Sequence, residues 1–214
     1  MGNLVKLKVC GMRDHENIMA VAALQPDYMG FIFFEKSPRF VGADFTIPHD
    51  FPAHISRVGV FVNAPTAMIQ VQAKKLSLHY VQLHGAETPE QIRELKETGI
   101  NVVKVFSVDD AFDFASVIPY EGLADFFLFD TKGKFYGGNA ATFNWNILRN
   151  YSQKVPFFLS GGISPKNVEA IALLEDMNLH SLDVNSGVET APGIKDTKLV
   201  HAILQQIESS KTNK

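Results

Sequence analysis

The sequence predicts an α/β protein that folds as a single (β/α)8 TIM barrel, and three observations support this prediction. Short apolar segments, typical of strands covered on both faces, alternate with segments of helical period. Eight such units fit in 214 residues, at about 27 residues each, which is close to the minimum for a strand–helix unit. The competing fold, an open doubly wound sheet, usually carries a glycine-rich fingerprint after its first strand, where this chain has Gly11 alone. We therefore expect one barrel domain over residues 1–214.

The composition favours a well-packed protein with a small ligand. Hydrophobic residues make up 46% of the chain and charged residues 20%, so a full core can be buried. The net charge of -3 gives no general attraction to nucleic acid or to a membrane surface, and we expect neither as a partner. One cysteine excludes an internal disulfide. The start of the chain lacks a signal-peptide pattern and no segment has the apolar length of a membrane span, which predicts a cytoplasmic protein.

The first expected strand, Lys6–Cys10, has the only cysteine of the chain at its carboxyl end. Apolar and polar side chains alternate along it, so Lys8 and Cys10 share one face. Asp14 is well placed to cap a helix from about His15 to Leu24. A nearby ammonium group favours a thiolate over a thiol, so Lys8 is expected to lower the pKa of Cys10. The alternative is that a lone cysteine is an inert small hydrophobic residue, which is the commoner case.

Three further strands and two helices complete the first half. The strands are expected at Tyr28–Phe34, Arg57–Val62 and Tyr80–His84. The helices are expected from Pro65 to about Leu76 and from Pro89 to near Gly99. In the first of these helices the expected buried side chains are Ala67, Met68, Val71 and Leu76. The segment Val41–His54 contains two prolines, so we expect coil with one short turn of helix there.

The second half repeats the alternation four more times. Its strands are expected at Asn101–Phe106, Phe126–Asp130, Val155–Leu159 and Leu182–Val184. Its helices are expected at Asp109–Val117, Trp145–Tyr151, Pro165–Met177 and Asp196–Ile207. The last helix carries Leu199, Ile203 and Leu204 on one face, which should pack on the barrel.

Polar residues at the carboxyl ends of the strands are the candidate functional residues, because the site of such a barrel lies there. Cys10 and Asp130 come from roughly opposite sides of the ring, so a small substrate can lie between a base and an acid. His84, Asp130 and Asp183 form a conceivable metal set, but metal barrels usually place more imidazoles at their strand ends. We therefore expect no metal and no cofactor. His84 is then a hydrogen-bonding residue of the pocket wall.

Two glycine-containing loops predict a phosphate site. Gly161 and Gly162 follow the seventh strand, and Ser186 and Gly187 follow the eighth. Their backbone amides lie where barrels of this kind commonly hold a phosphate. The alternative is that these glycines only permit tight turns. One glycine loop by itself would favour this alternative, whereas two adjacent loops favour phosphate binding. A phosphorylated small-molecule substrate follows from this reading.

At these residues the sequence resembles the phosphoribosylanthranilate isomerase family of tryptophan biosynthesis. The resembling blocks run through nearly the whole chain: Lys8 to Gly11, Gly30 to Phe33, Ser37 to Phe40, Val58 to Asn63, Val81 to Gly85, Phe129 to Lys132, Gly137-Gly138, Phe143 to Trp145, Leu159 to Gly162, and Asp183 to Glu189. So many blocks in the same order make the resemblance specific.

The resemblance implies a role for each matching residue. Cys10 would be the general base and Asp130 the general acid of a metal-free Amadori rearrangement, and Arg39 would hold the carboxylate of the anthranilate. The residues around the phosphate would be Gly161, Gly162, Ser186 and Gly187. Further residues lining the pocket would be Gln82, His84 and Asp183. Enzymes of this family occur as single or paired barrels, so a monomer and a homodimer both remain open.

Two departures and two alternatives accompany the resemblance. Gly137-Gly138 is followed by Asn139-Ala140, where the family usually has a small hydroxyl residue and another glycine, which bears on closure of this loop over the phosphate. The segment Val41–His54 stands where a longer helix is usual. One alternative is a related barrel isomerase acting on an aminoimidazole ribotide, which would be expected to carry an aspartate in place of Cys10. The other is a phosphate-binding barrel without activity, which would have no use for an acid and a base.

Overall fold

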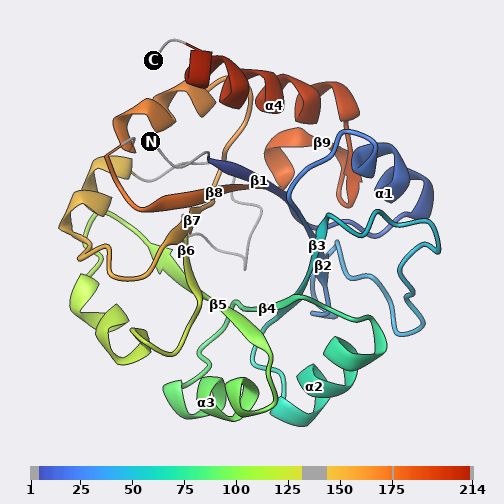
Figure 1. Ribbon diagram of the computed structural model, residues 1–214, viewed down its shortest axis with the longest axis horizontal. Coiled ribbons are helices and arrows are strands. Elements are labelled where there is room, and N and C mark those ends of the chain that lie inside the picture. Colours follow the sequence, from blue (N-terminus) through green and yellow to red (C-terminus); the bar gives the residue numbers. More distant parts are fainter. Residues whose placement is uncertain (1–4, 132–143, 175, 213–214) are drawn as a thin grey trace.

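Eight parallel strands close into a barrel (Figure 1). The structure is a computed structural model, and it describes residues 5–131, 144–174 and 176–212. The strands are β1 (Lys6–Val9), β2 (Tyr28–Ile32), β3 (Ser56–Phe61), β4 (Tyr80–Leu83), β5 (Asn101–Val108), β6 (Phe126–Thr131), β7 (Phe157–Leu159) and β8 (Leu179–Val184). Each strand pairs with the next one along the chain, and β8 closes on β1 with Asp183 opposite Lys8. The predicted barrel is confirmed.

Helices form an outer ring around the strands (Figure 1). The α-helices are α1 (His15–Ala22), α2 (Thr66–Lys75), α3 (Pro89–Glu97) and α4 (Thr197–Thr212). The remaining helical segments are 3-10 helices: η1 (Phe114–Tyr120), η2 (Trp145–Asn150), η3 (Val168–Leu174) and η4 (Ser186–Val188). The helices after β5, β6 and β7 are therefore shorter and tighter than expected. In η1 the cause is visible, because Pro119 lies inside the helix and cannot donate a backbone hydrogen bond.

Side-chain caps begin two of the helices where the sequence predicts them. The carboxylate of Asp14 accepts a hydrogen bond from the backbone N–H of Asn17 at 2.8 Å, which begins α1. The hydroxyl of Thr88 accepts from the N–H of Gln91, and Pro89 occupies the first turn of α3. These caps fix the chain immediately after β1 and β4, the strands that carry Cys10 and His84 toward the site.

The connection between β2 and β3 contains no helix in the structure, so the expected short helical turn in Val41–His54 is wrong. The backbone instead forms isolated turns, such as the one closed by a hydrogen bond from the N–H of Phe51 to the carbonyl of Pro48. Phe40 forms a parallel bridge to Ile32 at the start of this segment. Two prolines and the absence of a helical apolar stripe leave no side of the segment able to pack as a helix.

The exposed side of α2 also differs from the expectation. Its buried side chains are Ile69 and Ala73, with Leu76 following the helix, and their spacing of four and three residues forms one narrow stripe. Met68 and Val71 are 40% and 63% exposed, and Ala67 is exposed as well. The helix carries apolar side chains on more than one of its faces, so the sequence pattern alone does not decide which face packs against the barrel.

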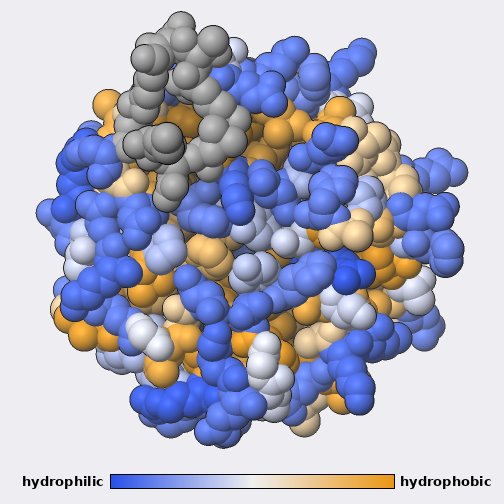
Figure 2. Space-filling view, in the orientation of Figure 1, coloured by the Kyte–Doolittle hydropathy of each residue, from blue (hydrophilic) through white to orange (hydrophobic). Residues whose placement is uncertain are grey.

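The interior of the barrel is apolar at its amino end and polar at its carboxyl end. Interior side chains near the amino ends of the strands form one apolar cluster: Tyr28, Val58, Val103, Val105, Leu128 and Phe158. A larger cluster fills the space between the strands and the helices. Seen down the barrel axis, the outer rim of the molecule is mostly hydrophilic (Figure 2). In the described part of the chain, no helix has the length and apolar character needed to cross a bilayer.

Candidate active site

A pocket open to solvent lies at the carboxyl ends of the strands, and the empty space in it and at its open mouth is together about 630 Å³. Every residue selected from the sequence as a site residue lines it: Cys10, Arg39, Gln82, His84, Asp130, Gly161, Gly162, Asp183, Ser186 and Gly187. Apolar walls are added by Ile32, Phe34, Val60 and Val62 from β2, β3 and the residues that follow them. The pocket thus has the mixture of apolar surface and a few converging polar groups that is typical of a small-molecule site.

Cys10 lies directly after β1, where its N–H donates to the carbonyl of Val184 at 2.8 Å. Its side chain packs on the bare backbone of Gly30, since a Cβ at that position would lie 2.7 Å from the Cys10 sulfur. Burial raises the pKa of the Cys10 thiol, and the ammonium groups of Lys8 and Lys195 reduce this rise without cancelling it. Lys8 does lower the pKa, as expected from the sequence, but burial outweighs this effect and the pKa is raised overall, because the sulfur is more deeply buried than the strand pattern indicates.

Lys8 is fully buried beside Cys10 and is held by two side chains. Its Nζ donates to Asp183 Oδ1 at 2.7 Å and to Gln82 Oε1 at 2.8 Å. Burial lowers the pKa of Lys8, but the negative charges of Asp183 and of the Cys10 thiolate outweigh this effect, and the pKa is raised overall. Lys8 therefore stays an ammonium ion, buried beside Cys10, and this charge state favours a thiolate at Cys10.

A chain of polar contacts runs from Lys8 to Asp130 through two hydrogen bonds and one ion-pair contact. Gln82 Nε2 lies 3.3 Å from His84 Nδ1, and His84 Nε2 lies 3.3 Å from Asp130 Oδ2. An ammonium group only donates, so the amide oxygen of Gln82 faces Lys8 and its NH2 group faces His84. The Nδ1 atom of His84 must then accept, which places the ring proton of neutral His84 on Nε2, facing Asp130. This arrangement agrees with the expectation of a hydrogen-bonding histidine in the wall.

Asp130, in β6, lies three strands from β1 around the ring. It is only 4% exposed, and its carboxylate faces the same pocket as Cys10. The two groups therefore face one ligand volume from different sides, as an acid and a base acting on one substrate must.

The loops after β7 and β8 form the side of the pocket that was predicted to bind phosphate. Gly161 and Gly162 adopt positive φ angles of 95° and 66°. A Cβ at Gly161 would collide with Thr131 Oγ1, and one at Gly187 would collide with the carbonyl oxygen of Ile163. Glycine is thus needed at both places for close packing, so its presence alone does not prove an anion site. The segment Gly137 to Ala140, which the sequence analysis connects with closure of a loop over the phosphate, lies outside the described residues.

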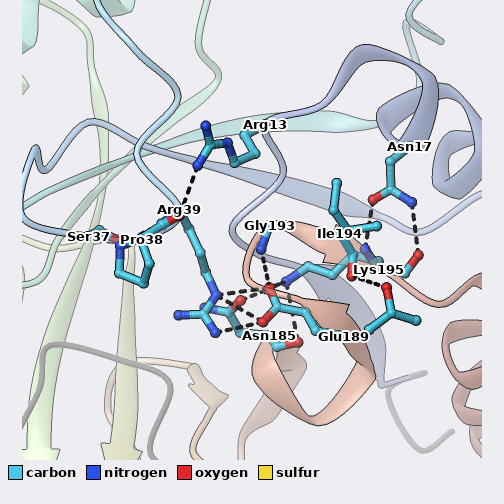
Figure 3. A network of polar contacts seen from close by, with 11 residues as sticks. Arg13, Asn17, Ser37, Pro38, Arg39, Asn185, Glu189, Gly193, Ile194 and Lys195 are labelled. Atoms are coloured by element: carbon cyan, nitrogen blue, oxygen red, sulfur yellow. Dashed lines mark hydrogen bonds and ion pairs between the residues drawn. The ribbon is translucent and has the colours of Figure 1, made fainter.

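Arg39 is held by an acidic residue that sequence reasoning missed. Its Nε donates to Glu189 Oε1 at 2.8 Å and its Nη2 donates to Glu189 Oε2 at 2.6 Å (Figure 3). Lys195 Nζ donates to the same carboxylate at 2.6 Å. Glu189 and Lys195 stand on an antiparallel hairpin of β9 (Glu189–Ala191) and β10 (Ile194–Lys195). The Pro192-Gly193 pair is a turn signal that could have revealed this hairpin.

Within the ranges that the structure describes, no cluster of three or more His, Cys, Asp or Glu side chains is arranged to hold a metal ion. The acidic and imidazole groups of the pocket are engaged elsewhere: Asp183 with Lys8, and Asp130 with His84.

Comparison with known proteins identifies similar chains over almost the whole length. A family model described as N-(5'-phosphoribosyl)anthranilate (PRA) isomerase matches residues 7–206. An N-(5'-phosphoribosyl)anthranilate isomerase from Phocaeicola vulgatus is 46% identical over 202 residues, which cover 94% of this chain and 97% of the relative. The relative from Parabacteroides distasonis, with the same name, is 42% identical and covers 94% of this chain and 92% of its own length.

Solved structures agree with these relatives. The crystal structure of phosphoribosyl anthranilate isomerase from Thermotoga maritima superposes with a TM-score of 0.82 at 30% identity, covering 96% of this chain and 99% of the other. A second structure of such an isomerase contains reduced 1-(o-carboxyphenylamino)-1-deoxyribulose 5-phosphate and superposes with a TM-score of 0.78 at 28% identity, with the same coverage.

Proposed function

The chain belongs to the N-(5'-phosphoribosyl)anthranilate isomerase family, and we propose that it carries out this isomerisation with Cys10 as general base and Asp130 as general acid. It is an isomerase of tryptophan biosynthesis, an intramolecular oxidoreductase that converts N-(5-phosphoribosyl)anthranilate into 1-(2-carboxyphenylamino)-1-deoxyribulose 5-phosphate. The observation that supports the assignment of acid and base is that Cys10 and Asp130 face one pocket from separate strands.

Two proton transfers make up the proposed mechanism. Asp130 in its protonated form gives a proton to the ring oxygen of the ribose, which breaks the ring C–O bond and leaves an iminium ion. Cys10 as thiolate then takes the proton from C2 of the sugar, which yields an enol that tautomerises to the ketone. At that point Cys10 has gained one proton and Asp130 has lost one. Exchange with solvent restores both groups, and no net proton or electron is consumed.

The order of these steps suits the ionisation of Cys10. Burial raises the thiol pKa in the free pocket, with Lys8 and Lys195 opposing the rise. Ring opening creates a cationic iminium close to the sulfur, and an additional positive charge at that distance favours the thiolate. The thiolate form of the base is therefore most populated at the step that requires it.

The two anionic ends of the substrate are assigned to two parts of the pocket. We assign the phosphate to the loops that carry Gly161, Gly162, Ser186 and Gly187. We assign the carboxylate to Arg39, whose planar fork matches a carboxylate geometrically. Gln82, His84 and Asp183 support the reacting groups through the hydrogen bonds described above.

One assay tests the activity. Purified protein is added to freshly made phosphoribosylanthranilate, and the loss of anthranilate-type fluorescence is followed. We expect rapid conversion by the wild-type protein and a fall of about 100- to 10,000-fold in turnover for Asp130→Asn, with product binding largely retained. An unchanged turnover number in a folded Asp130→Asn variant would remove this residue as the acid.

The proposed acid–base pair requires no Lewis acid. We therefore expect dialysis against a strong chelator to leave the turnover number unchanged. A loss of activity that is restored by adding back a divalent cation would contradict the mechanism.

A further inference from the structure

A buried ion-pair network lies beside Arg39, outside the set of residues that the proposed mechanism uses (Figure 3). We propose that Glu189 is a positioning residue for substrate selection: it holds one edge of the Arg39 guanidinium, so that the opposite edge faces the pocket ready for a carboxylate. This inference deepens the proposed function, because it rests on Arg39 as the carboxylate-binding residue.

The hydrogen bonds between Arg39 and Glu189 use only part of the guanidinium group. Glu189 takes the Nε and Nη2 edge, at 2.8 and 2.6 Å. A guanidinium has five N–H donors, and its Nη1–Nη2 edge can form a second fork of the same kind. Among the described residues, none accepts a hydrogen bond from Nη1 of Arg39. Arg39 lines the pocket whereas Glu189 stands behind it, so the remaining edge is the one that a ligand meets.

The stem of Arg39 is fixed as firmly as its head. A Cβ at Gly11 would lie 2.7 Å from Arg39 Cδ, so the stem runs directly over the backbone that follows Cys10. The N–H of Arg39 donates to the hydroxyl of Ser37 at 3.1 Å. Arg13 donates from Nη1 to the carbonyl of Pro38 at 2.9 Å, which ties the loop after β2 to the loop after β1 (Figure 3). An arginine held in this way loses little rotational freedom when it binds a ligand.

The network of Arg39, Lys195 and Glu189 has two positive charges and one negative charge. Glu189 is nearly buried and carries one negative charge, since its hydrogen bonds from Arg39 and Lys195 outweigh burial and lower its pKa. Arg39 and Lys195 each carry one positive charge, and the Lys195 side chain is completely buried. Without Lys195, Glu189 would neutralise Arg39. With both cations present the group has a net charge of about +1, which matches a single carboxylate.

The β9–β10 hairpin holds this network in place. The N–H of Gly193 in its turn donates to Glu189 Oε1 at 3.0 Å. Asn17 of α1 bonds the backbone of Lys195 in both directions, at 2.8 Å each (Figure 3). Lys195 Nζ also donates to Asn185 Oδ1 at 2.7 Å, in the loop that leads to Ser186. The hairpin thus connects the carboxylate end of the pocket to α1 and to the loop after β8.

A pair of ligands tests the proposal. One is the reduced 1-(2-carboxyphenylamino)-1-deoxyribulose 5-phosphate, and the other is the same molecule without the carboxyl group. The ratio of their dissociation constants, measured by calorimetry near pH 7, reports only on recognition of the carboxylate. We expect the wild-type protein to prefer the carboxylate ligand, and Glu189→Gln to reduce this preference by about tenfold. In this variant Arg39 is held by a weaker neutral partner, and Lys195, whose ammonium form Glu189 stabilises, loses its charge more readily, so the network gains little positive charge.

Two further variants complete the design. Glu121→Gln is the matched control, because Glu121 accepts from Lys154 at 2.8 Å and does not line the pocket, so its preference ratio should stay at the wild-type value. Glu189→Asp keeps the negative charge and should retain more of the preference than Glu189→Gln. This variant keeps the test informative if Glu189→Gln fails to fold.

The possible results distinguish a failure of the Glu189 proposal from a failure of Arg39 as the carboxylate-binding residue. A wild-type preference ratio in folded Glu189→Gln, or an equal loss of affinity for both ligands, overturns the positioning role of Glu189. A wild-type protein that binds the two ligands equally well, or an Arg39→Lys variant that keeps the full preference, overturns Arg39 as the carboxylate-binding residue. The second pair of results would refute part of the proposed function itself.

Discussion

Cys10 lies close to two ammonium groups, yet burial dominates its ionisation. Lys8 and Lys195 both favour the thiolate, and the apolar surroundings of the sulfur oppose it more strongly. The neighbour Lys8 can be read from strand alternation, because residues two apart share a face. The depth of burial could not be read in this way, since it depends on Gly30, Ile32 and Val60 of other strands. The local pattern thus identified Cys10 and the lowering effect of Lys8 on its pKa, but not the burial that raises the pKa overall.

Replacing Cys10 by serine tests whether the thiolate is the base. Serine keeps the size and hydrogen bonding of the side chain, but its hydroxyl is far too weak an acid to supply an anion near neutral pH. We expect Cys10→Ser to lower the turnover number about 100- to 10,000-fold, as Cys10→Ala should, with product affinity little changed. Steady-state kinetics with product-inhibition constants measure both quantities. Near-normal turnover in Cys10→Ser would leave the cysteine as a buried hydrophobic residue.

The charge of Lys195 sets an upper pH limit for carboxylate recognition. Burial lowers the pKa of Lys195 to about 8, although Glu189 and Cys10 act to raise it; Arg39 lowers it further. Because this pKa lies below the ordinary lysine value, Lys195 loses its positive charge as the pH rises through about 8, and the Arg39 network becomes neutral. We expect the carboxylate ligand to bind more weakly above that pH, while the ligand without the carboxyl group shows no such step. Titration of both dissociation constants against pH measures the effect, and parallel curves would contradict it.

At the scale of elements, the structure confirms the strands best and the connections least. A strand buried on both faces has a strong apolar signal, and its polar carboxyl end can be located to within a residue or two, as at Asp130 and His84. The phase of α2 was misjudged at Met68 and Val71, because only the shape of the neighbouring surface decides which apolar stripe is buried. The hairpin of Glu189 and Lys195 was missed because strands of two or three residues have no period to detect.

The loop after β7 allows the strain of a positive φ to be separated from the effect of close packing. Gly161 and Gly99 have φ angles of 95° and 79°, but a Cβ at Gly161 would collide with Thr131, whereas one at Gly99 meets nothing within 4 Å. We expect Gly99→Ala to lower the free energy of unfolding by about 1 kcal/mol from backbone strain alone. Gly161→Ala should lower it by about 3 kcal/mol, because overpacking adds to the strain. Urea denaturation compares the two variants.

The same pair of variants bears on the phosphate. If the amides around Gly161 bind it, Gly161→Ala should weaken inorganic phosphate as a competitive inhibitor, while Gly99→Ala should not. Equal inhibition of both variants would place the phosphate elsewhere in the pocket.

At the scale of the whole molecule, the two ends of the barrel have different tasks. The polar residues gather at the carboxyl ends of the strands, and aromatic side chains such as Tyr28 and Phe158 fill the amino end. Closure itself, in which Asp183 of β8 comes opposite Lys8 of β1, joins residues from the two ends of the chain. No local pattern predicts that pairing; it followed only from counting eight units and from the rule that such units form barrels. The buried lysine–aspartate pair beneath Cys10 is a consequence of that closure.

His180 at the amino end of the barrel links the stability of the fold to pH. Its Nε2 lies 2.7 Å from the hydroxyl of Tyr28, and its ring stacks on Phe158 and lies tilted against Phe126. Burial lowers the pKa of His180 to about 4, with a smaller lowering from Lys6. Since the unfolded chain takes up this proton near pH 6.5 and the folded protein does not, stability is full above about pH 6.5 and falls as the pH drops toward 4.

The window between about pH 7.5 and pH 5 reports on histidines, because the carboxylates titrate mostly below it. His180 contributes here together with His79, whose pKa is also lowered, by burial and by Arg57. We expect the free energy of unfolding to fall by about 1 kcal/mol across this window, a value reduced for the partial solvent exposure of the ring. His180→Asn removes this titrating group and should reduce the slope of this part of the curve, while the activity assay at neutral pH should be unchanged because His180 is remote from the pocket. Chemical denaturation at several pH values measures the slope. An equal slope in the wild-type protein and in His180→Asn would show that another group, and not the ring closing the barrel, senses the acid.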